Sequence, residues 1–306
     1  MSVEAAAWAG KILAARGERE VGTPEIVRSY PWSTVERLPT SSGAVYLKRV
    51  ASPFAVELAL LPLLSQWFPE SVPAILAVDA GGRRLLMADA GMPLRTRLKK
   101  SFDAAPLGNA LALCARIQRA AAGRTAELLS IGLADWRLGR LLDLYRELVD
   151  RTQGLAAEER AALRAHAPRF EALCAELAAC GIPETLEHCD FHDNNVLVRD
   201  DRMVIADWGD AVIAHPFFSL ASCIESAIWH HALDAVAIET LTEAYLASWR
   251  DVGTPIGRRD AVRLARRLRP VTLAMNLDRI AAIEGAGDTF ADMPATELRR
   301  FLRGSV

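Results

Sequence analysis

The chain of 306 residues has a formal net charge of −2 at pH 7, and 51% of its residues are hydrophobic. This content is typical of a globular protein and is enough for one large core or two moderate ones. A charge so close to zero gives no strong attraction to nucleic acid or to an anionic membrane surface, so we expect neither as a partner.

The cysteines and the N-terminal segment indicate a reducing compartment. Five cysteines, an odd number, lie in apolar helical patterns or in one polar loop rather than in a regular framework: Cys114, Cys174, Cys180, Cys189 and Cys223. The apolar residues 5–10 lie between Glu4 and Lys11 and are too few for a signal-peptide core or a membrane span. We therefore expect a cytoplasmic protein with an amphipathic helix over about residues 3–19.

Three short segments rich in β-forming residues follow this helix. They read EIVRSY, STVERLPT and AVYLKRV, and the last two are separated by the turn residues Ser41, Ser42 and Gly43. This pattern predicts three antiparallel strands between residues 24 and 50.

A helix and a second hairpin are predicted next. Ser52 and Pro53 suit the cap and the first turn of a helix that reaches about Gln66. Segments 73–79 and 84–88 flank a Gly-Gly turn, which indicates a hairpin. These elements together predict a small antiparallel sheet with one helix.

The period of the apolar residues changes to that of helices after about residue 93. Helical spacing recurs over six stretches: 106–122, 136–150, 157–180, 217–232, 236–250 and 258–283. The change of period divides the chain into residues 1–90 and 91–306. It predicts an α+β fold in which a small antiparallel sheet precedes a larger, mainly helical part.

One polar segment interrupts the helical pattern. Residues 188–210 read HCDFHDNNVLVRDDRMVIADWGD. Within it, NVLV and RMVIA have the composition of two short paired strands, which would hold the loops on either side in place. The polar residues of these loops are the strongest functional signal in the chain.

The order of His188, Asp190, Asn195 and Asp207 is the order that phosphoryl transfer needs. Asp190 is the candidate catalytic base, since an aspartate beside an acceptor hydroxyl can accept its proton. Asn195 and Asp207 supply the hard oxygen ligands that Mg²⁺ prefers beside nucleotide phosphates and water. The five-residue step from Asp190 selects Asn195 over its neighbour Asn194. Each residue alone would more simply be a turn residue, but the four together favour catalysis.

A zinc site is the alternative for the same segment. His188, Cys189, Asp190 and His192 are all possible zinc ligands. Structural zinc sites draw paired ligands from two places in the chain, and no second pair with such spacing is present. The spacing therefore disfavours zinc.

The first predicted sheet offers a second part of the site. In AVYLKRV, strand alternation places Lys48 and Arg49 on opposite faces of the sheet. Kinase-like folds carry their phosphate-binding lysine on the third strand, which makes Lys48 the candidate. Glu57 stands alone among apolar residues in the next predicted helix, so it needs a cationic partner, and Lys48 is the natural one. The alternative is a lysine at a strand edge and an exposed glutamate.

The HxDxHxxN form of the catalytic segment, followed by DWGD, resembles the aminoglycoside phosphotransferase and choline kinase-like family. The resemblance extends from about residue 27 to about residue 226. It implies a two-lobed protein-kinase-like fold. Residues 1–90 would form the nucleotide-binding lobe, and residues 91–306 would form a helical lobe with the catalytic loop, the metal-binding loop and the acceptor site.

The same resemblance implies further roles for individual residues. Met87 to Asp89 would be the hinge strand that faces adenine. His188 and His192 would brace the catalytic loop. Asp210 would assist metal binding or hold its own loop.

The chain departs from the kinase pattern in two places. The glycine-rich loop is missing, because SYPWST occupies its position, and we expect Ser33 and Thr34 to supply hydroxyl and backbone donors to phosphate instead. The chain also passes from DWGD into HPFFSLA with no room for a long activation loop, which disfavours a protein substrate.

These observations predict a Mg²⁺-dependent small-molecule kinase. It would move the γ-phosphoryl group of ATP, with GTP left open, to a hydroxyl of an aminoglycoside, a sugar or an amino alcohol. The alternative is a non-catalytic nucleotide-binding pseudokinase that regulates a partner. The oligomeric state stays open.

The sequence leaves the acceptor undecided between two charge types. Four acids are candidates for the binding of a cationic acceptor: Glu225, Asp234, Glu239 and Glu243. Six arginines between residues 258 and 269 are the candidates for an anionic one.

Overall fold

The computed structural model describes residues 3–304, apart from the side chains of residues 288 and 289. The chain forms two compact units. The first contains the chain up to Met92, together with Leu197–Gly209 and Ile283–Gly285. The second contains Pro93–Val196, Asp210–Ala282 and the chain from Ala286 onward.

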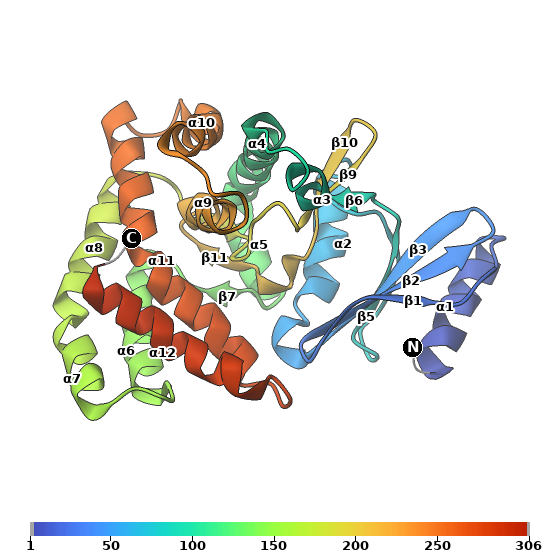
Figure 1. Cartoon of the computed structure of the whole chain (residues 1–306), viewed down its shortest axis with the longest axis horizontal. Coiled ribbons are helices and arrows are strands. Elements are labelled where there is room, and N and C mark those ends of the chain that lie inside the picture. Colours follow the sequence, from blue (N-terminus) through green and yellow to red (C-terminus); the bar gives the residue numbers. More distant parts are fainter. Residues whose placement is uncertain (1–2, 305–306) are drawn as a thin grey trace. The chain divides into compact units, whose positions relative to one another are not determined.

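The first unit is built on a five-stranded antiparallel sheet (Figure 1). Its strands are β1 (Glu25–Tyr30), β2 (Ser33–Thr40), β3 (Gly43–Val50), β4 (Ile75–Asp79) and β5 (Arg84–Ala88), in the order β1-β2-β3-β5-β4. All five strands lie where the sequence predicts them. The preceding helix α1 (Val3–Ala15) is confirmed but ends four residues earlier than predicted.

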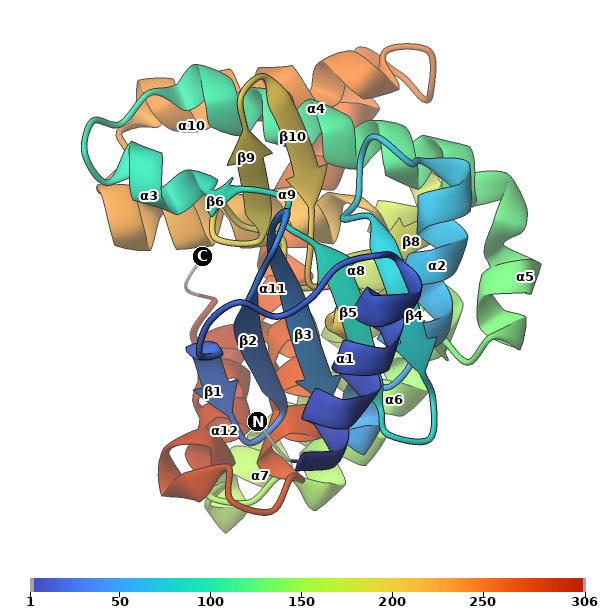
Figure 2. The ribbon, with the colours of Figure 1, turned by 90° about the vertical axis from the view of Figure 1, so that its right-hand side faces the viewer.

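Strand alternation places different residues on the two faces of this sheet. Leu38, Leu47 and Leu86 point to one face and form a buried cluster with Leu13 of α1, which lies across the strands (Figure 2). Lys48 follows Leu47 on β3 and therefore points to the opposite face. One face of the sheet thus forms a core, while the other carries the candidate phosphate-binding lysine.

The helix after β3 begins later than predicted. A 3-10 turn, η1 (Ser52–Phe54), follows the strand, and helix α2 begins only at Glu57 and runs to Trp67. The prediction that Ser52 is the cap was wrong, because Ala51 holds that position, whereas Pro53 lies in the first turn as predicted. The extra turn is the reason that Glu57 lies in the first turn of a helix instead of in its middle.

The second unit is mainly helical. Its helices are α3 (Leu94–Leu98), α4 (Ala104–Ala121), α5 (Thr125–Ser130), α6 (Leu138–Arg151), α7 (Ala157–Ala165), α8 (Ala167–Ala179), α9 (Phe217–His231), α10 (Ala235–Leu246), α11 (Pro255–Ala281) and α12 (Gly287–Arg303). The predicted helix over 157–180 is two helices, because Pro168 lies in the first turn of α8 and cannot continue the hydrogen bonding of α7. Helix α12, which was not predicted, packs beside α11 (Figure 1).

Short strands hold the polar segment. β8 (Thr185–Glu187) ends directly before His188, and β9 (Val196–Arg199) begins directly after Asn195. β9 pairs with β10 (Arg202–Ile205) and with β6 (Met92–Pro93), so the predicted hairpin is confirmed. β8 pairs with β11 (Val212–Ala214), which also pairs with β7 (Ala134–Asp135).

Two further predictions concern cysteines and membranes. All five cysteines carry free thiols, and four of them are buried. Within residues 3–304, no helix is both long enough and apolar enough to cross a membrane.

The packing of α1 on the sheet predicts a stability effect. Leu13 is fully buried, so Leu13→Ala leaves a cavity. The substitution should lower the free energy of unfolding, measured by urea denaturation, by about 2–5 kcal/mol. Lys11→Ala on the exposed side of the same helix should change it by less than about 0.5 kcal/mol. If Leu13→Ala changed the free energy of unfolding as little as Lys11→Ala does, the packing of α1 would not contribute to stability.

Candidate active site

The loop after β8 begins with a residue in an uncommon backbone conformation. Cys189 has a φ of 64°, in the left-handed region that is unfavourable for a residue with a Cβ atom. Its backbone N–H donates to Glu187 Oε1 at 3.0 Å. A strained residue of this kind persists only where its surroundings fix it, and such residues gather at functional sites.

A buried polar network provides that support. Glu187 is fully buried and receives hydrogen bonds from Ser219 Oγ at 2.8 Å and from Gln118 Nε2 at 3.1 Å. Tyr245 Oη in turn donates to Gln118 Oε1 at 2.6 Å. Burial raises the pKa of Glu187 to about 8, against the opposing effect of the hydrogen bonds from Ser219 and Cys189. The base of the loop therefore rests on a carboxyl group that favours its neutral form.

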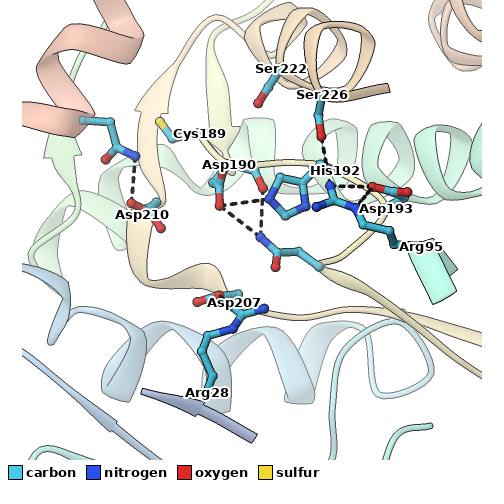
Figure 3. Close-up of polar contacts among 12 residues, drawn as sticks. Arg28, Arg95, Cys189, Asp190, His192, Asp193, Asp207, Asp210, Ser222 and Ser226 are labelled. Atoms are coloured by element: carbon cyan, nitrogen blue, oxygen red, sulfur yellow. Dashed lines mark hydrogen bonds and ion pairs between the residues drawn. The ribbon is translucent and has the colours of Figure 1, made fainter. Parts of the chain in front are cut away.

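The loop brings three of the predicted residues together (Figure 3). Asn195 Nδ2 donates to the backbone oxygen of Asp190 at 3.0 Å and to its Oδ2 at 3.2 Å. His192 Nε2 lies 3.3 Å from the same Oδ2 atom. Because the amide nitrogen of Asn195 binds Asp190, its carbonyl oxygen is the atom left for a metal ion. The Asp190 side chain is 43% exposed and can be reached by an acceptor.

The two histidines of the motif have different surroundings. His188 is fully buried and its ring makes an edge contact with Phe191, which agrees with a bracing role. Burial opposes a charge on His192, but the adjacent Asp190 carboxylate outweighs this effect and raises the pKa of His192. A cationic His192 would stabilise the ionised form of Asp190.

A second brace was not anticipated from the sequence. Asp193 is buried, and its carboxylate accepts hydrogen bonds from Arg95 Nε at 2.8 Å and contacts His231 Nε2 at 2.7 Å. Arg95 also donates to Ser226 Oγ at 2.9 Å (Figure 3). Although burial opposes ionisation, these partners hold the pKa of Asp193 below its usual value. Asp193 thereby ties the loop after β8 to both α3 and α9. No sequence pattern pointed to His231 as part of this contact.

One arginine of the group 258–269 lies at the catalytic loop. Arg269 is buried in α11, donates to Ser222 Oγ at 3.1 Å and lies 3.4 Å from the backbone oxygen of Cys189. Its Nε is 3.7 Å from Glu225, which also binds Arg300 at 2.7 Å. Glu225, one of the four acids proposed for a cationic acceptor, is therefore already paired with two arginines.

In the first unit, Lys48 lies between two carboxylates. Its Nζ is 2.8 Å from Glu57 Oε1, 2.6 Å from Glu57 Oε2 and 2.6 Å from Asp207 Oδ1. The expected pair of Lys48 and Glu57 is therefore present. Burial opposes the charge of Lys48, but Asp207 and Glu57 outweigh it and raise its pKa, so the ammonium stays charged. Burial raises the pKa of Glu57.

Asp207 is itself held in a strained conformation. Its φ is 65°, in the same left-handed region as that of Cys189. The next residue, Trp208, donates its backbone N–H to Glu57 Oε1 at 3.1 Å. Gly209 then passes so close to Phe54 that a Cβ atom there would lie 3.3 Å from the Phe54 Cβ. Glu57 therefore positions both Lys48 and the loop that carries Asp207.

A second cation contacts Asp207. Arg28 Nη1 of β1 lies 3.0 Å from Asp207 Oδ2 (Figure 3). Arg28 was not predicted from the sequence, because the pairing of β1 is irregular at this point. Lys48 and Arg28 thus bind one oxygen each of the same carboxylate.

The remaining predicted nucleotide ligands also lie in the first unit. The hydroxyl oxygens of Ser33 and Thr34 are buried and have no hydrogen-bond partner among the described residues. Ser33 pairs with Val50, which shares the face of Lys48, whereas Thr34 pairs with Arg49 on the other face. The register thus favours Ser33 over Thr34 as a neighbour of Lys48.

The predicted hinge combines the end of β5 with a tight turn. Met87 is part of β5, and Asp89 accepts a hydrogen bond from the Gly91 N–H at 2.9 Å and forms an ion pair with Arg199. Gly91 has a φ of 102°, and a Cβ atom there would lie 2.1 Å from the backbone oxygen of Val198. Only glycine fits at this turn.

Asp210 accepts hydrogen bonds from residues of α11. Asn276 Nδ2 donates to Asp210 Oδ1 at 2.8 Å, and Arg279 Nη1 donates to its backbone oxygen at 3.1 Å. These contacts agree with the loop-holding role that the sequence allowed for Asp210.

The side chains predicted to bind a metal ion are oxygen donors. Within residues 3–304, no three His, Cys, Asp or Glu side chains form a metal-binding group. Asp207 of the first unit and Asn195 of the second unit each offer an oxygen of the kind that Mg²⁺ prefers. The buried hydroxyl of Ser33 and the charged Lys48 suit the phosphates.

The raised pKa of Glu187 predicts a pH dependence of stability. The pKa of Glu187 in the folded protein, about 8, exceeds the ordinary value of 4.5. Glu187 therefore contributes fully to the free energy of unfolding below pH 4.5, and this contribution is lost as the pH rises toward 8. Glu187→Gln should remove this decline, which is at most about 1.4 kcal/mol per pH unit, when unfolding is measured in urea from pH 5 to 8. The exposed Glu158→Gln is the control. The same decline in both variants would contradict a neutral Glu187.

Three solved structures share this fold over most of their lengths. Choline kinase LicA from Streptococcus pneumoniae has a TM-score of 0.66 at 15% identity, over 99% of this chain and 99% of its own. The GDP and kanamycin complex of APH(2")-IIia has a TM-score of 0.64 at 14% identity, over 98% and 99%. Amicoumacin kinase hAmiN, in complex with AMP-PNP and Ca²⁺, has a TM-score of 0.61 at 14% identity, over 92% and 88%. These likenesses confirm the kinase-like α+β fold.

The family follows from the sequence itself. No curated protein matches the chain. A family model described as the phosphotransferase enzyme family matches residues 32–254, which is most of the chain. The chain belongs to the phosphotransferase enzyme family.

Proposed function

We propose that the protein transfers the γ-phosphoryl group of ATP to a hydroxyl group of a small molecule. The observation that carries this proposal is the contact of Lys48 with both Glu57 and Asp207. In kinases, a lysine on the third strand must be paired with a helical glutamate before it can bind the nucleotide phosphates. The aspartate beside it holds the metal ion.

The two parts of the chain have separate tasks in this proposal. Residues 1–90 bind the nucleotide, with Lys48 and Ser33 at the phosphates and Met87 to Asp89 at the base. Residues 91–306 bind the acceptor and carry Asp190. Asn195 and Asp207 hold Mg²⁺, which when bound neutralises charge on the phosphate oxygens.

The transfer forms one bond to phosphorus, breaks another and moves one proton to Asp190. The acceptor oxygen forms a bond to the γ-phosphorus, and the bond from that phosphorus to the β–γ bridging oxygen breaks, so ADP leaves with the electron pair. The acceptor hydroxyl loses its proton to the Asp190 carboxylate. His192 and Asn195, both in contact with Asp190 Oδ2, keep this carboxylate in place.

The charges near the catalytic loop favour an acceptor with few ammonium groups. Glu225 is paired with Arg300 at 2.7 Å and lies near Arg269, so a polycationic aminoglycoside would have to displace an arginine from it. Glu239 and Glu243 share Arg259 in the same way, and Asp234 caps α10. Among the acceptor classes considered, we therefore favour a sugar or an amino alcohol.

Substitution of the base tests the proposal. Asp190→Asn keeps the shape of the side chain but removes the proton acceptor, so kcat should fall by about 10²–10⁴-fold while nucleotide binding stays unchanged. The measurement is Mg²⁺-dependent ADP release from ATP across a panel of sugars, amino alcohols, aminoglycosides and nucleosides.

The control is Asp201→Asn in the exposed turn between β9 and β10, which should behave like the wild type. Turnover that survives in Asp190→Asn would remove Asp190 from the role of base. Nucleotide binding without turnover of any acceptor by the wild type would favour a regulatory pseudokinase.

A further inference from the structure

Arg28 lies on the Lys48 face of the sheet because of an irregularity in β1. Ile26 pairs with Glu36, but Arg28 pairs with Val35, so one residue of β1 is skipped between them. Residues two apart on a regular strand share a face, whereas this bulge moves Arg28 to the face opposite to that of Ile26. Bulges often redirect a side chain beside an active site.

The register places Arg28 and Lys48 in one row across the sheet. Arg28 is opposite Val35 on β2, and Val35 is opposite Lys48 on β3. The two cations are therefore two strands apart on the same face, and their side chains meet at the two oxygens of Asp207, at 3.0 Å and 2.6 Å. The carboxylate that would bind Mg²⁺ is thus held by one cation on each oxygen.

Most of the hydrogen-bonding capacity of Arg28 is unused. A guanidinium has five N–H donors, and in the described part of the chain Nη1 to Asp207 is the one contact that Arg28 makes. The side chain is 31% exposed, so a ligand can reach it. Lys48, by contrast, is 5% exposed and bound to two carboxylates.

The β1–β2 turn explains why such a cation is needed. The turn contains Pro31 and Trp32 instead of glycines, and Tyr30 stacks on Trp32 with ring centroids 4.7 Å apart. A turn of this composition cannot bring several backbone N–H groups close to phosphate as a glycine-rich loop does. A guanidinium from the adjoining strand can supply donors in their place, because its fork matches phosphate oxygens.

We propose that Arg28 is a phosphate-binding residue that also occupies Asp207 when no nucleotide is bound. In the empty protein it neutralises the carboxylate. When a nucleotide binds, the guanidinium turns to its phosphates and leaves an oxygen of Asp207 to Mg²⁺. This inference rests on the proposed function and adds to it the residue that replaces the glycine-rich loop.

The first test compares ligands with and without phosphate. Binding of ADP and of adenosine is measured by calorimetry in EDTA, so that no metal contributes. Arg28→Gln should weaken ADP binding by about tenfold, the loss expected for one charge-assisted contact, and should leave adenosine binding unchanged. A purely structural role would weaken both ligands equally, and that result would overturn the proposal.

The matched control is Arg37→Gln. Arg37 lies on β2 and pairs with Tyr46, so it shares the Lys48 face and the same hairpin, but its ion pair is with Glu25. ADP binding should stay at the wild-type value in this variant. A loss equal to that of Arg28→Gln would show that any cation on this face has the same effect, and it would contradict a specific role of Arg28.

The second test measures metal binding in the absence of nucleotide. Binding of Mn²⁺ is followed by electron paramagnetic resonance. Arg28→Gln should bind Mn²⁺ several-fold more tightly than the wild type, because Asp207 Oδ2 is no longer held by a cation. Equal Mn²⁺ affinity in the two proteins would contradict the occupation of Asp207 by Arg28.

Further controls distinguish a folding defect, and a failure of the proposed function, from a failure of the Arg28 proposal. If Arg28→Gln does not fold, as judged by its Tm, Arg28→Lys replaces it, with a smaller loss of ADP affinity and again none for adenosine. If the wild type binds neither ADP nor ATP with Mg²⁺, the proposed function itself fails. Wild-type ADP binding that Arg28→Gln leaves unchanged overturns the Arg28 proposal alone.

Discussion

A buried lysine between two carboxylates is the interaction on which the candidate nucleotide site depends. A charge inside a protein is unfavourable unless it is paired and hydrogen-bonded, and Lys48 meets this condition only because Glu57 and Asp207 both contact it. Glu57 also accepts the N–H of Trp208 and thereby fixes the segment that carries Asp207. One glutamate in the first turn of α2 thus positions a cation and a candidate metal ligand at once.

The catalytic loop depends on a different kind of support. Its strained residue Cys189 is anchored to Glu187, a buried carboxyl group whose pKa of about 8 favours the neutral form at moderate pH. Asp193 binds the other end of the loop to Arg95 and His231. These contacts use residues that lie between and beside the motif positions Asp190 and Asn195.

The sequence was sufficient for those features that follow from regular periodicity. Runs of β-forming residues between turn residues predicted the five strands, and the isolation of Glu57 among apolar residues predicted its pair with Lys48. Arg28 could not be predicted, because the bulge in β1 reverses the face that alternation would assign to it. The fold class and the family are confirmed, whereas the roles of the site residues remain predictions.

Other features were missed because their signal lies below the length that periodicity needs. β7, β8 and β11 have two or three residues each, and they pair across long sequence separations. The brace at Asp193 is equally non-local, since it joins α3 to the catalytic loop and α9. Helix α12 contains Pro294, which lowers the helical signal of an otherwise amphipathic segment.

In the proposed function, Lys48 and Glu57 act as one unit in nucleotide binding. A double-mutant cycle on Mg²⁺·ADP binding, with Lys48→Met, Glu57→Gln and the double variant, tests it most directly by calorimetry. We expect both single variants to bind Mg²⁺·ADP more weakly than the wild type. The double variant should bind it no more weakly than Lys48→Met, because Glu57 acts through Lys48. Losses that add in the double variant, or single variants that bind like the wild type, would contradict it.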